Sequence, residues 1–254
     1  MRRLLIEEPA SRAAMWSRRV GAFAWLSMAV ALLLARFERL LPYEALAAVI
    51  ACGALAAVAM ALAILAFGST WRSGARGVPS ALTGLLLGVA LLAYPVGVSL
   101  RDLISPPALD LTTDPLSPPQ PLTPLKQLPR GAPPPAVASI NDAGARRPIA
   151  PSLIDRRMDD ALTLTWRAAI LNSWHITDVD YPRAPPYREA RFSATVPSPL
   201  IHWPSDAIVR LQQTEEGVRV DVRLVARERW SLLRGGDADI QGFFERIEAL
   251  LQPP

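Results

Sequence analysis

Two long stretches without a charged residue occupy most of the first hundred positions. Residues 45–71 carry no charge across 27 positions, and residues 77–100 carry none across 24. An α-helix needs roughly 20 apolar residues to cross the hydrocarbon core of a bilayer, which is about 30 Å thick. Both stretches therefore predict transmembrane helices, at about residues 44–68 and 78–100.

An earlier apolar run is shorter, because residues 20–35 give only 16 uncharged positions between Arg19 and Arg36. It crosses a bilayer if the side chains of both arginines extend toward the headgroups and the apolar residues beyond Arg36 lengthen the apolar span. We expect it to form the first of three spans, at about residues 17–37. If it lies on the membrane surface instead, only two spans remain.

The same run could be read as a secretory signal, because Ala29-Val30-Ala31 has the small-x-small pattern of a cleavage site. That site comes early in the run, which continues through Leu34 and is followed by the charged residues 36–39. We therefore expect an uncleaved anchor, with removal of the segment as the alternative.

Basic residues near the ends of the spans predict the orientation, because they are enriched on the cytoplasmic side. Seven lie on the N-terminal side and three on the other. The seven are Arg2, Arg3, Arg12, Arg18, Arg19, Arg72 and Arg76, and the three are Arg36, Arg39 and Arg101. The N-terminus is thus predicted in the cytoplasm. After three crossings the C-terminal domain is predicted in the periplasm, as a multi-pass protein of a bacterial inner membrane.

The source and the partners are constrained by the charged residues. Arginine outnumbers lysine 26 to 1, which is typical of a GC-rich bacterial genome. The sequence pI is about 9.8, but residues before Ala108 carry ten basic and five acidic side chains, against 17 and 18 from there onward. The excess positive charge belongs to the membrane half. A nucleic-acid partner therefore loses its main support, and the lipid bilayer is the expected partner.

None of the predicted spans has an ionisable residue at its centre. Transporters and proton relays usually need one, so conduction is disfavoured as a function. Gly84 and Gly88 form a small-xxx-small pair in the third span. This pair either lets a neighbouring helix approach closely or reflects the general frequency of glycine in membrane helices.

A proline-rich segment separates the membrane part from the tail. Residues 105–151 contain 13 of the 25 prolines, which excludes helix and central strand and favours an extended chain. We assign residues 1–104 to the membrane domain, 105–147 to a linker or a surface wrap, and 148–254 to an α+β domain. The linker alternative makes the segment a stiff spacer, and the wrap alternative makes it part of the domain surface.

The tail alternates between helical and strand patterns, which predicts an antiparallel sheet covered by two helices. Asp155 is expected to cap the first helix, and Asp237 or Asp239 the second. The expected elements are strands at 149–154, 174–181 and 189–196, a hairpin of 207–213 with 217–227, and helices at 157–171 and 238–251. The helical stripes are Met158, Leu162, Trp166, Ala169 and Ile170 in the first helix, and Ile240, Phe243, Phe244, Ile247, Leu250 and Leu251 in the second.

The second arm of the hairpin alternates apolar and charged residues, so one face is expected in the core and the other in water. Arg210, Arg219, Arg223 and Arg227 are expected to form a basic strip on the wet face. The strip either recognises an anion, such as a lipid headgroup or a carboxylate ligand, or is a solvated surface balanced by nearby acidic residues.

Several short segments of the tail are shared with a known family. They are Leu111-Thr112-Thr113-Asp114-Pro115 with Pro118-Pro119, Ser173-Trp174, the run from Gly217 to Arg223 with Ala226-Arg227, and Asp239-Ile240 with Arg246-Ile247. With these segments, residues 109–251 resemble the domain of unknown function 1499 family, including its membrane-anchored bacterial members. The resemblance implies a fold and a location rather than a reaction.

The family's most recognisable stretch resembles Ser-Arg-x-Gly-x-x-Asp-Leu-Gly-x-Asn-x-x-Arg, and the chain departs from it at Ala226, Arg229, Gln241 and Phe243. Arg227, Asp239 and Arg246 keep the residue types of the family. Together with Arg223, they are the candidate binding residues, and no catalytic residue is assigned.

Other site chemistry has little support in the sequence. The two histidines, His175 and His202, have no acidic residue at ligand spacing, so no metal is expected. Ser173, His175 and Asp178 do not share a strand face, and the sequence lacks both a nucleophile elbow and a phosphate-binding glycine loop. No cofactor is expected. We predict a non-catalytic binding or structural domain whose partner is an envelope protein or an anionic small ligand; the alternative is a small hydrolase or lipid-modifying enzyme.

Overall fold

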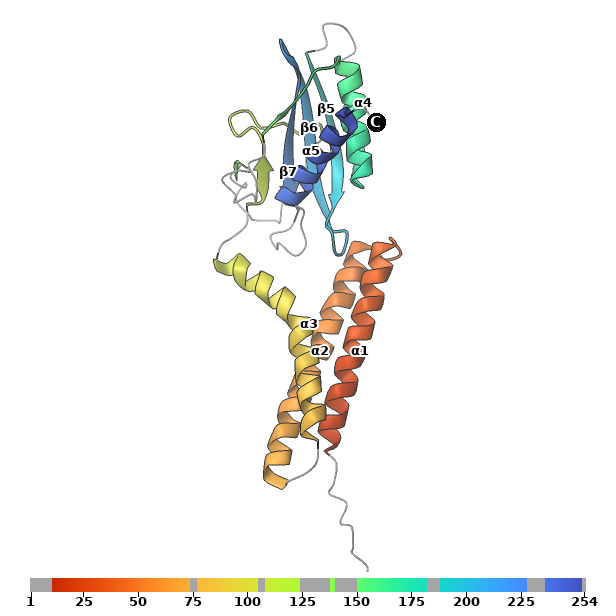
Figure 1. Ribbon diagram of the computed structural model, residues 1–254, viewed down its shortest axis with the longest axis vertical. Coiled ribbons are helices and arrows are strands. Elements are labelled where there is room, and N and C mark those ends of the chain that lie inside the picture. The colour runs from red at the N-terminus through yellow and green to blue at the C-terminus, as the bar shows by residue number, and fades with distance from the viewer. Residues whose placement is uncertain are drawn as a thin grey trace, which may run out of the picture. The chain divides into compact units, whose positions relative to one another are not determined.

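The computed structural model describes residues 11–73, 77–104, 108–123, 138–139, 150–181, 188–227 and 236–252. The chain divides into two compact units, Met1–Leu100 and Arg101–Pro254 (Figure 1). The first unit is helical and the second combines a sheet with two helices.

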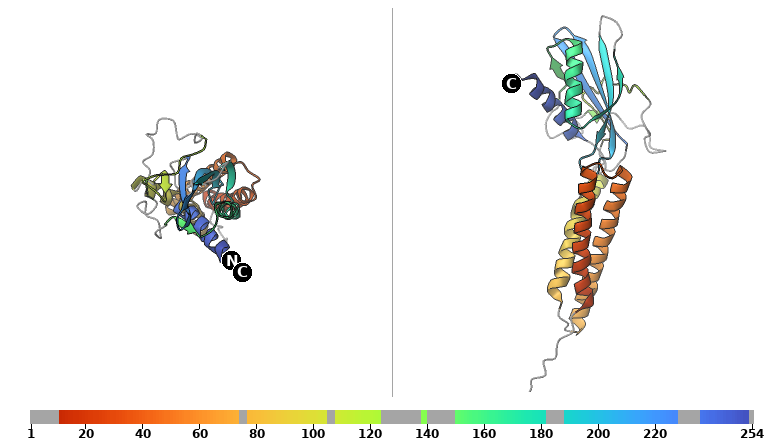
Figure 2. Two further views of the ribbon diagram at one scale, coloured as in Figure 1. Left: turned by 90° about the horizontal axis from the view of Figure 1, so that it is seen from above. Right: turned by 90° about the vertical axis from the view of Figure 1, so that its right-hand side faces the viewer.

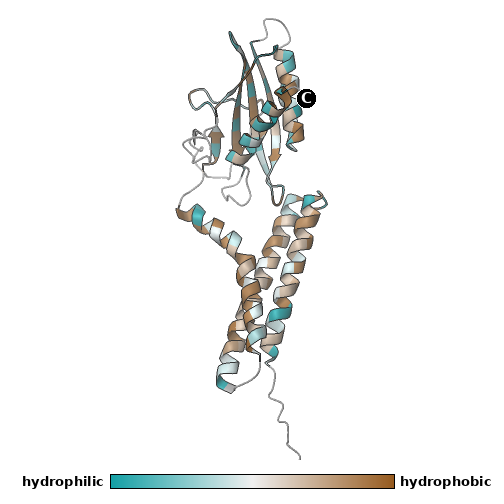
Figure 3. Ribbon diagram, viewed as in Figure 1, coloured by the Kyte–Doolittle hydropathy of each residue, from teal (hydrophilic) through white to brown (hydrophobic). Residues whose placement is uncertain are grey.

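Three long helices make up the membrane part: α1 at Arg12–Arg36, α2 at Pro42–Ser73 and α3 at Val78–Ile104. Each is long and apolar enough to cross a membrane. Apolar residues cover nearly all of their length (Figure 3). The prediction of three candidate spans is therefore confirmed, including the short first run, which is part of a helix of 25 residues.

The three helices pack together through small residues. One buried cluster joins Ala24 of α1, Ala56 of α2 and Leu91 of α3. Two polar side chains add contacts between helices, because the Ser17 hydroxyl donates to Ala59 O at 2.9 Å and Trp25 Nε1 donates to Leu87 O at 2.9 Å. The first helix is thus a member of the bundle, held by both of its neighbours.

Gly84 and Gly88 lie at the two tightest helix contacts. A Cβ added at Gly84 would lie 1.9 Å from Ser17 Oγ and 2.7 Å from the Ser17 carbonyl carbon. One added at Gly88 would lie 2.5 Å from Met60 Cγ. Close approach therefore explains this glycine pair, since no side chain fits in either gap. Beyond them α3 continues through Pro95 and bends in its C-terminal half (Figure 1).

The second unit is built on a mostly antiparallel sheet. Its strands are β1 at Asp110–Thr112, β2 at Ala138–Ser139, β3 at Ser152–Ile154, β4 at His175–Asp180, β5 at Glu189–Pro197, β6 at Pro204–Thr214 and β7 at Gly217–Ala226. The order is β2-β1-β7-β6-β5-β4, and β3 also pairs with β7. Only β2 runs parallel to its neighbour, β1. Helices α4 (Met158–Leu171) and α5 (Asp237–Leu251) cover one face of this sheet (Figure 2). The predicted fold class is confirmed.

The core lies between this sheet face and the two helices. Its centre is Phe243 of α5, which is fully buried and stacks on Trp174 with ring centroids 4.7 Å apart. The predicted stripe of α5 is buried at Ile240, Phe243, Phe244 and Ile247. The N-cap residue of α5 is Gly236 rather than the predicted Asp237 or Asp239, and Asp239 in the first turn accepts the Gly236 N–H at 2.8 Å.

The packing face of α4 agrees with the prediction in part. Met158, Leu162 and Ala169 of the predicted stripe are buried, but Trp166 and Ile170 are 37% and 57% exposed. Thr165 and Ala168 are fully buried in their place, and these small residues let the helix lie close to the sheet. The predicted cap is also wrong, because the N-cap residue is Arg157 rather than Asp155, and it makes no side-chain cap bond.

The late hairpin forms where predicted, but with a shorter turn. Thr214 pairs with Gly217 across a turn of two residues, Glu215 and Glu216, rather than three. Gly217 has a φ of +139°, and a Cβ there would lie 2.6 Å from Ile154 O in the neighbouring strand. Glycine is therefore required at the start of β7 by both backbone conformation and space.

Replacement of Gly84 by alanine tests the helix contact. We expect G84A to destabilise the bundle by about 1–3 kcal/mol, because the added methyl group forces α1 and α3 apart. G97A is the matched control, since nothing lies within 4 Å of a Cβ at Gly97 in the same helix. The unfolding midpoint in a detergent titration measures both. Equal midpoints for the two variants would contradict the assigned contact.

Candidate functional site

The face of the sheet opposite the two helices is covered by the chain's own proline-rich segment. We call residues 108–123 the strap and the face that they cover the outer face. The strap begins beside the sheet, where β1 pairs with β7 at Asp110↔Val225 and Thr112↔Arg223. It then crosses toward β6, where Arg210 binds it.

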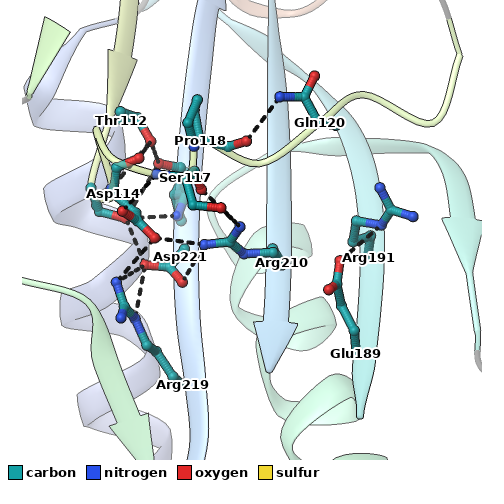
Figure 4. A network of polar contacts seen from close by, with 12 residues as sticks. Thr112, Asp114, Ser117, Pro118, Gln120, Glu189, Arg191, Arg210, Arg219 and Asp221 are labelled. Carbon is teal, nitrogen blue, oxygen red and sulfur yellow. Dashed lines mark hydrogen bonds and ion pairs between the residues drawn. The ribbon is translucent and has the colours of Figure 1, made fainter. Parts of the chain in front are cut away.

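Arg210 of β6 joins the strap to the sheet (Figure 4). Its guanidinium is 6% exposed and donates through Nη2 to Asp221 at 3.1 Å and to Asp114 at 2.9 Å. Its Nη1 donates to the backbone oxygen of Ser117 at 2.8 Å. One acid comes from the adjacent strand and the other partners from the strap, so the arginine holds the two together.

Asp221 is the most buried acid of this network, with no exposed surface. It also accepts from Arg219, through Nε at 3.2 Å and Nη2 at 3.0 Å. A buried carboxylate is tolerated only when charged donors surround it. Two arginines meet that requirement here.

A second pair fixes the start of the strap. Arg223 donates to Asp110 through Nε at 2.9 Å and Nη2 at 2.6 Å, and Asp110 is almost fully buried. The Nη1 of Arg223 donates to the Pro119 carbonyl oxygen at 3.1 Å. This two-point geometry is the strongest form of an arginine–carboxylate contact.

The prediction of a wet outer face is therefore wrong. Arg210 and Asp221 are 5% and 0% exposed. The physical reason is that the strap supplies the missing partners, Asp110 and Asp114, about a hundred residues away along the chain. The alternation along β7 is correct, but both faces of the strand are covered.

The four predicted binding residues lie in different parts of the domain. Arg223 pairs with Asp110, and Arg227 pairs with Asp206 through Nε at 2.9 Å and Nη2 at 2.6 Å. Asp239 lies in the first turn of α5, and burial together with the charge of Asp237 raises its pKa although it accepts the Gly236 N–H. Arg246 is exposed on α5.

A polar cavity of about 290 Å³ lies on the outer face beside the Arg227–Asp206 pair. The strap contributes Pro121 and Thr123, and strands β4, β5 and β6 contribute most of the remaining walls. Its lining is Pro121, Thr123, Thr177, Asp178, Ser193, Ala194, Thr195, Asp206, Ala207, Ile208 and Arg227. Of the four predicted residues, only Arg227 reaches this cavity.

A β-bulge places an acid in the cavity. The register moves from Ile176↔Ala194 to Asp178↔Ser193, so Thr177 is an extra residue in β4. Bulges redirect side chains, and this one puts Asp178 directly across from Ser193. The Asp178 carboxylate accepts the N–H of Val179 at 2.9 Å and forms no ion pair with a described residue.

Ser193 carries an unsatisfied hydroxyl in the same place. Its Oγ is buried and has no hydrogen-bond partner among the described residues. A buried polar atom without a partner is rare in folded proteins and calls for an explanation. No described base forms a hydrogen bond with this hydroxyl.

Sequence reasoning missed Asp178, Ser193, Thr195 and Asp206 as members of one site. The alternation along β5 identifies the outward side chains of Ser193 and Thr195, but it does not reveal a cavity. Among the described residues, no group of three or more His, Cys, Asp or Glu side chains could hold a metal ion.

No protein-family model, curated protein or solved structure matches the chain. The resemblance of residues 109–251 to the domain of unknown function 1499 family stays a prediction.

Removal of Asp221 tests the network. We expect D221A to lower the unfolding free energy of the domain by about 3–5 kcal/mol, because Arg210 stays buried with part of its charge uncompensated. D180A is the matched control: Asp180 pairs with Arg191 on the same sheet, but 57% of its side chain is exposed, so about 1 kcal/mol or less is expected. Hydrogen exchange of peptides from β6 and β7 measures both. A loss no greater than that of the control would contradict the role of the network.

The acid dependence of the strap is set by Asp114. Burial alone would raise its pKa, but the Ser117 N–H, the hydrogen bond from Arg210 and the charges of Arg219 and Arg210 together hold the pKa below its ordinary value. Its stabilising contribution is therefore complete above the unfolded pKa of about 3.9 and is lost as the pH falls through the lower folded pKa.

We expect the difference in unfolding free energy between wild type and D114N to be constant near neutral pH and to shrink only at pH values below about 3.9. Asp239, with its raised pKa, has the opposite pH dependence, but it is present in both proteins and cancels in the difference. Urea titrations at a series of pH values give this difference. A decline that begins well above the unfolded pKa would contradict the assignment.

Proposed function

We propose that this chain is a three-pass protein of a bacterial inner membrane that presents a non-catalytic binding domain in the periplasm. Its N-terminus is on the cytoplasmic side. The observation that carries the proposed binding role is the polar cavity on the outer face, where Ser193 and Asp178 have hydrogen-bonding capacity that no described residue uses.

The orientation is supported by the charges beside the helices. Seven arginines flank the N-terminal side of the spans and three flank the other. An odd number of crossings then carries the domain to the side away from the N-terminus. The candidate spans α1, α2 and α3 supply that odd number.

Binding is favoured over hydrolysis by the environment of Ser193 Oγ, the one buried hydroxyl that has no hydrogen-bond partner among the described residues. A serine nucleophile needs a base within hydrogen-bond reach, and Ser193 Oγ has no such partner in the described part of the chain. Asp178 faces Ser193 across the strand pair without bonding to it. Both groups remain available to a ligand.

Fusions at two positions test the orientation. We expect alkaline phosphatase to be active after residue 254 and green fluorescent protein to fluoresce after residue 76, because the two positions lie on opposite sides of α3. The reciprocal fusions are the controls and should be silent. Fluorescence without phosphatase activity after residue 254 would overturn the proposed periplasmic location and would favour a first helix that does not cross.

A further inference from the structure

We infer that the cavity on the outer face binds a small uncharged ligand rich in hydroxyl groups, of the size of one sugar ring. This inference rests on the proposed function, because it takes the domain to be a binding module. It adds the chemical class of the ligand.

The first argument is the hydrogen-bonding capacity left open in the lining. Ser193 Oγ is buried without a hydrogen-bond partner among the described residues, while the exposed Thr177 and the half-buried Thr195 bring two further hydroxyls to the lining. Each hydroxyl can donate one hydrogen bond and accept others, and the Asp178 carboxylate can only accept. A ligand hydroxyl also donates and accepts. A ring carrying several hydroxyls therefore matches this mixed set better than a ligand that only donates or only accepts.

The second argument is charge. Asp206 is neutralised by Arg227, whose guanidinium donates to both carboxylate oxygens. Asp178 has no such partner among the described residues. The lining thus carries one uncompensated negative charge, which repels phosphate, sulfate and carboxylate groups. The same carboxylate is a strong acceptor for a neutral hydroxyl, since hydrogen bonds to a charged group are the strong ones.

The third argument is size and surface. A cavity of about 290 Å³ is at the lower limit of small-molecule sites, which run from roughly 300 to 1,000 Å³. It accommodates one ring rather than an extended chain. Pro121 on the strap adds apolar surface to the lining, whereas Ile208 of β6 is fully buried. The C–H groups of a sugar ring can pack on Pro121 while its hydroxyls face the polar residues.

The test uses the full-length protein in detergent micelles with glucose, N-acetylglucosamine and mannose as probes. Saturation-transfer NMR detects binding, and titration gives the dissociation constant. We expect at least one of these neutral sugars to bind, and both S193A and D178N to weaken it by about tenfold or more, because each loses a hydrogen bond to the ligand. Thermal unfolding of each variant confirms that it is folded.

Two variants on the other side of the sheet serve as controls. T163A and D160N make the same kinds of change at exposed positions of α4, so they should leave sugar binding unchanged. Purified peptidoglycan sacculi distinguish a free sugar from the end of a glycan chain. Co-sedimentation that is lost in S193A and D178N, without binding of the free sugars, assigns the ligand to a glycan end and supports the inference.

Three results would overturn the inference. They are the absence of any sugar or sacculus binding, binding that S193A and D178N do not weaken, and binding of glucosamine or a sugar phosphate in place of the neutral sugars. The last result would leave the proposed binding function intact and change only the ligand class. The assay uses purified protein, so it is independent of the orientation that the fusions measure.

Discussion

A guanidinium buried against the face of a sheet must find acceptors for its donors, and Arg210 cannot find enough of them in its own hairpin. Nη2 donates to both Asp221 on the adjacent strand and Asp114 of the strap, and Nη1 donates to Ser117 of the strap, while the buried Nε has no partner among the described residues. The penalty for an uncompensated buried charge therefore opposes release of the strap from the outer face. The position of the strap on the outer face depends on this constraint, and so does the cavity that Pro121 and Thr123 of the strap help to enclose.

A proline-rich chain is chemically well suited to this position. Proline has no backbone N–H, so it leaves no donor unsatisfied when it lies against a sheet, and its fixed φ favours an extended path. Its carbonyl remains a good acceptor, which Arg223 uses at Pro119. Arginines on the sheet and free carbonyls on the strap are complementary. The prolines of this segment are thus compatible with an ordered covering layer. The prediction that its composition excludes a central strand is wrong, because β1 pairs with both β2 and β7.

The sequence predicted those parts of the fold that depend on local pattern. Charge-free length identified the three helices, and alternation identified the β6–β7 hairpin, although its turn has two residues rather than the predicted three, since Thr214 pairs with Gly217. Two features were outside its reach. The buried face of α4 at Thr165 and Ala168 reflects close packing on the sheet rather than hydrophobicity. The bulge that sets Asp178 opposite Ser193 leaves no trace in residue type.

The candidate site was only partly predictable for the same reason. The sequence pattern identified Arg223 and Arg227 as charged residues on one strand face. Whether they are solvated or paired depends on acidic residues far away in the chain. Asp110 lies 113 positions before Arg223, and Asp206 lies 21 before Arg227. No local pattern encodes such pairs. The contact of Asp239 with the start of α5 is local, but the predicted N-cap position was wrong, because Gly236 is the N-cap and Asp239 binds its N–H from the first turn.

The charge balance of the outer face bears on the kind of ligand that it can select. The four arginines of the predicted basic strip, Arg210, Arg219, Arg223 and Arg227, have four carboxylate partners, Asp110, Asp114, Asp206 and Asp221. A strip that looked basic in the sequence therefore has no excess positive charge to offer an anion. Asp178 has no ion-pair partner among the described residues, and it gives the cavity that it lines a negative potential. Because hydroxyl groups carry no net charge, they are the donors that such a cavity can accept without repelling them or requiring a counter-ion.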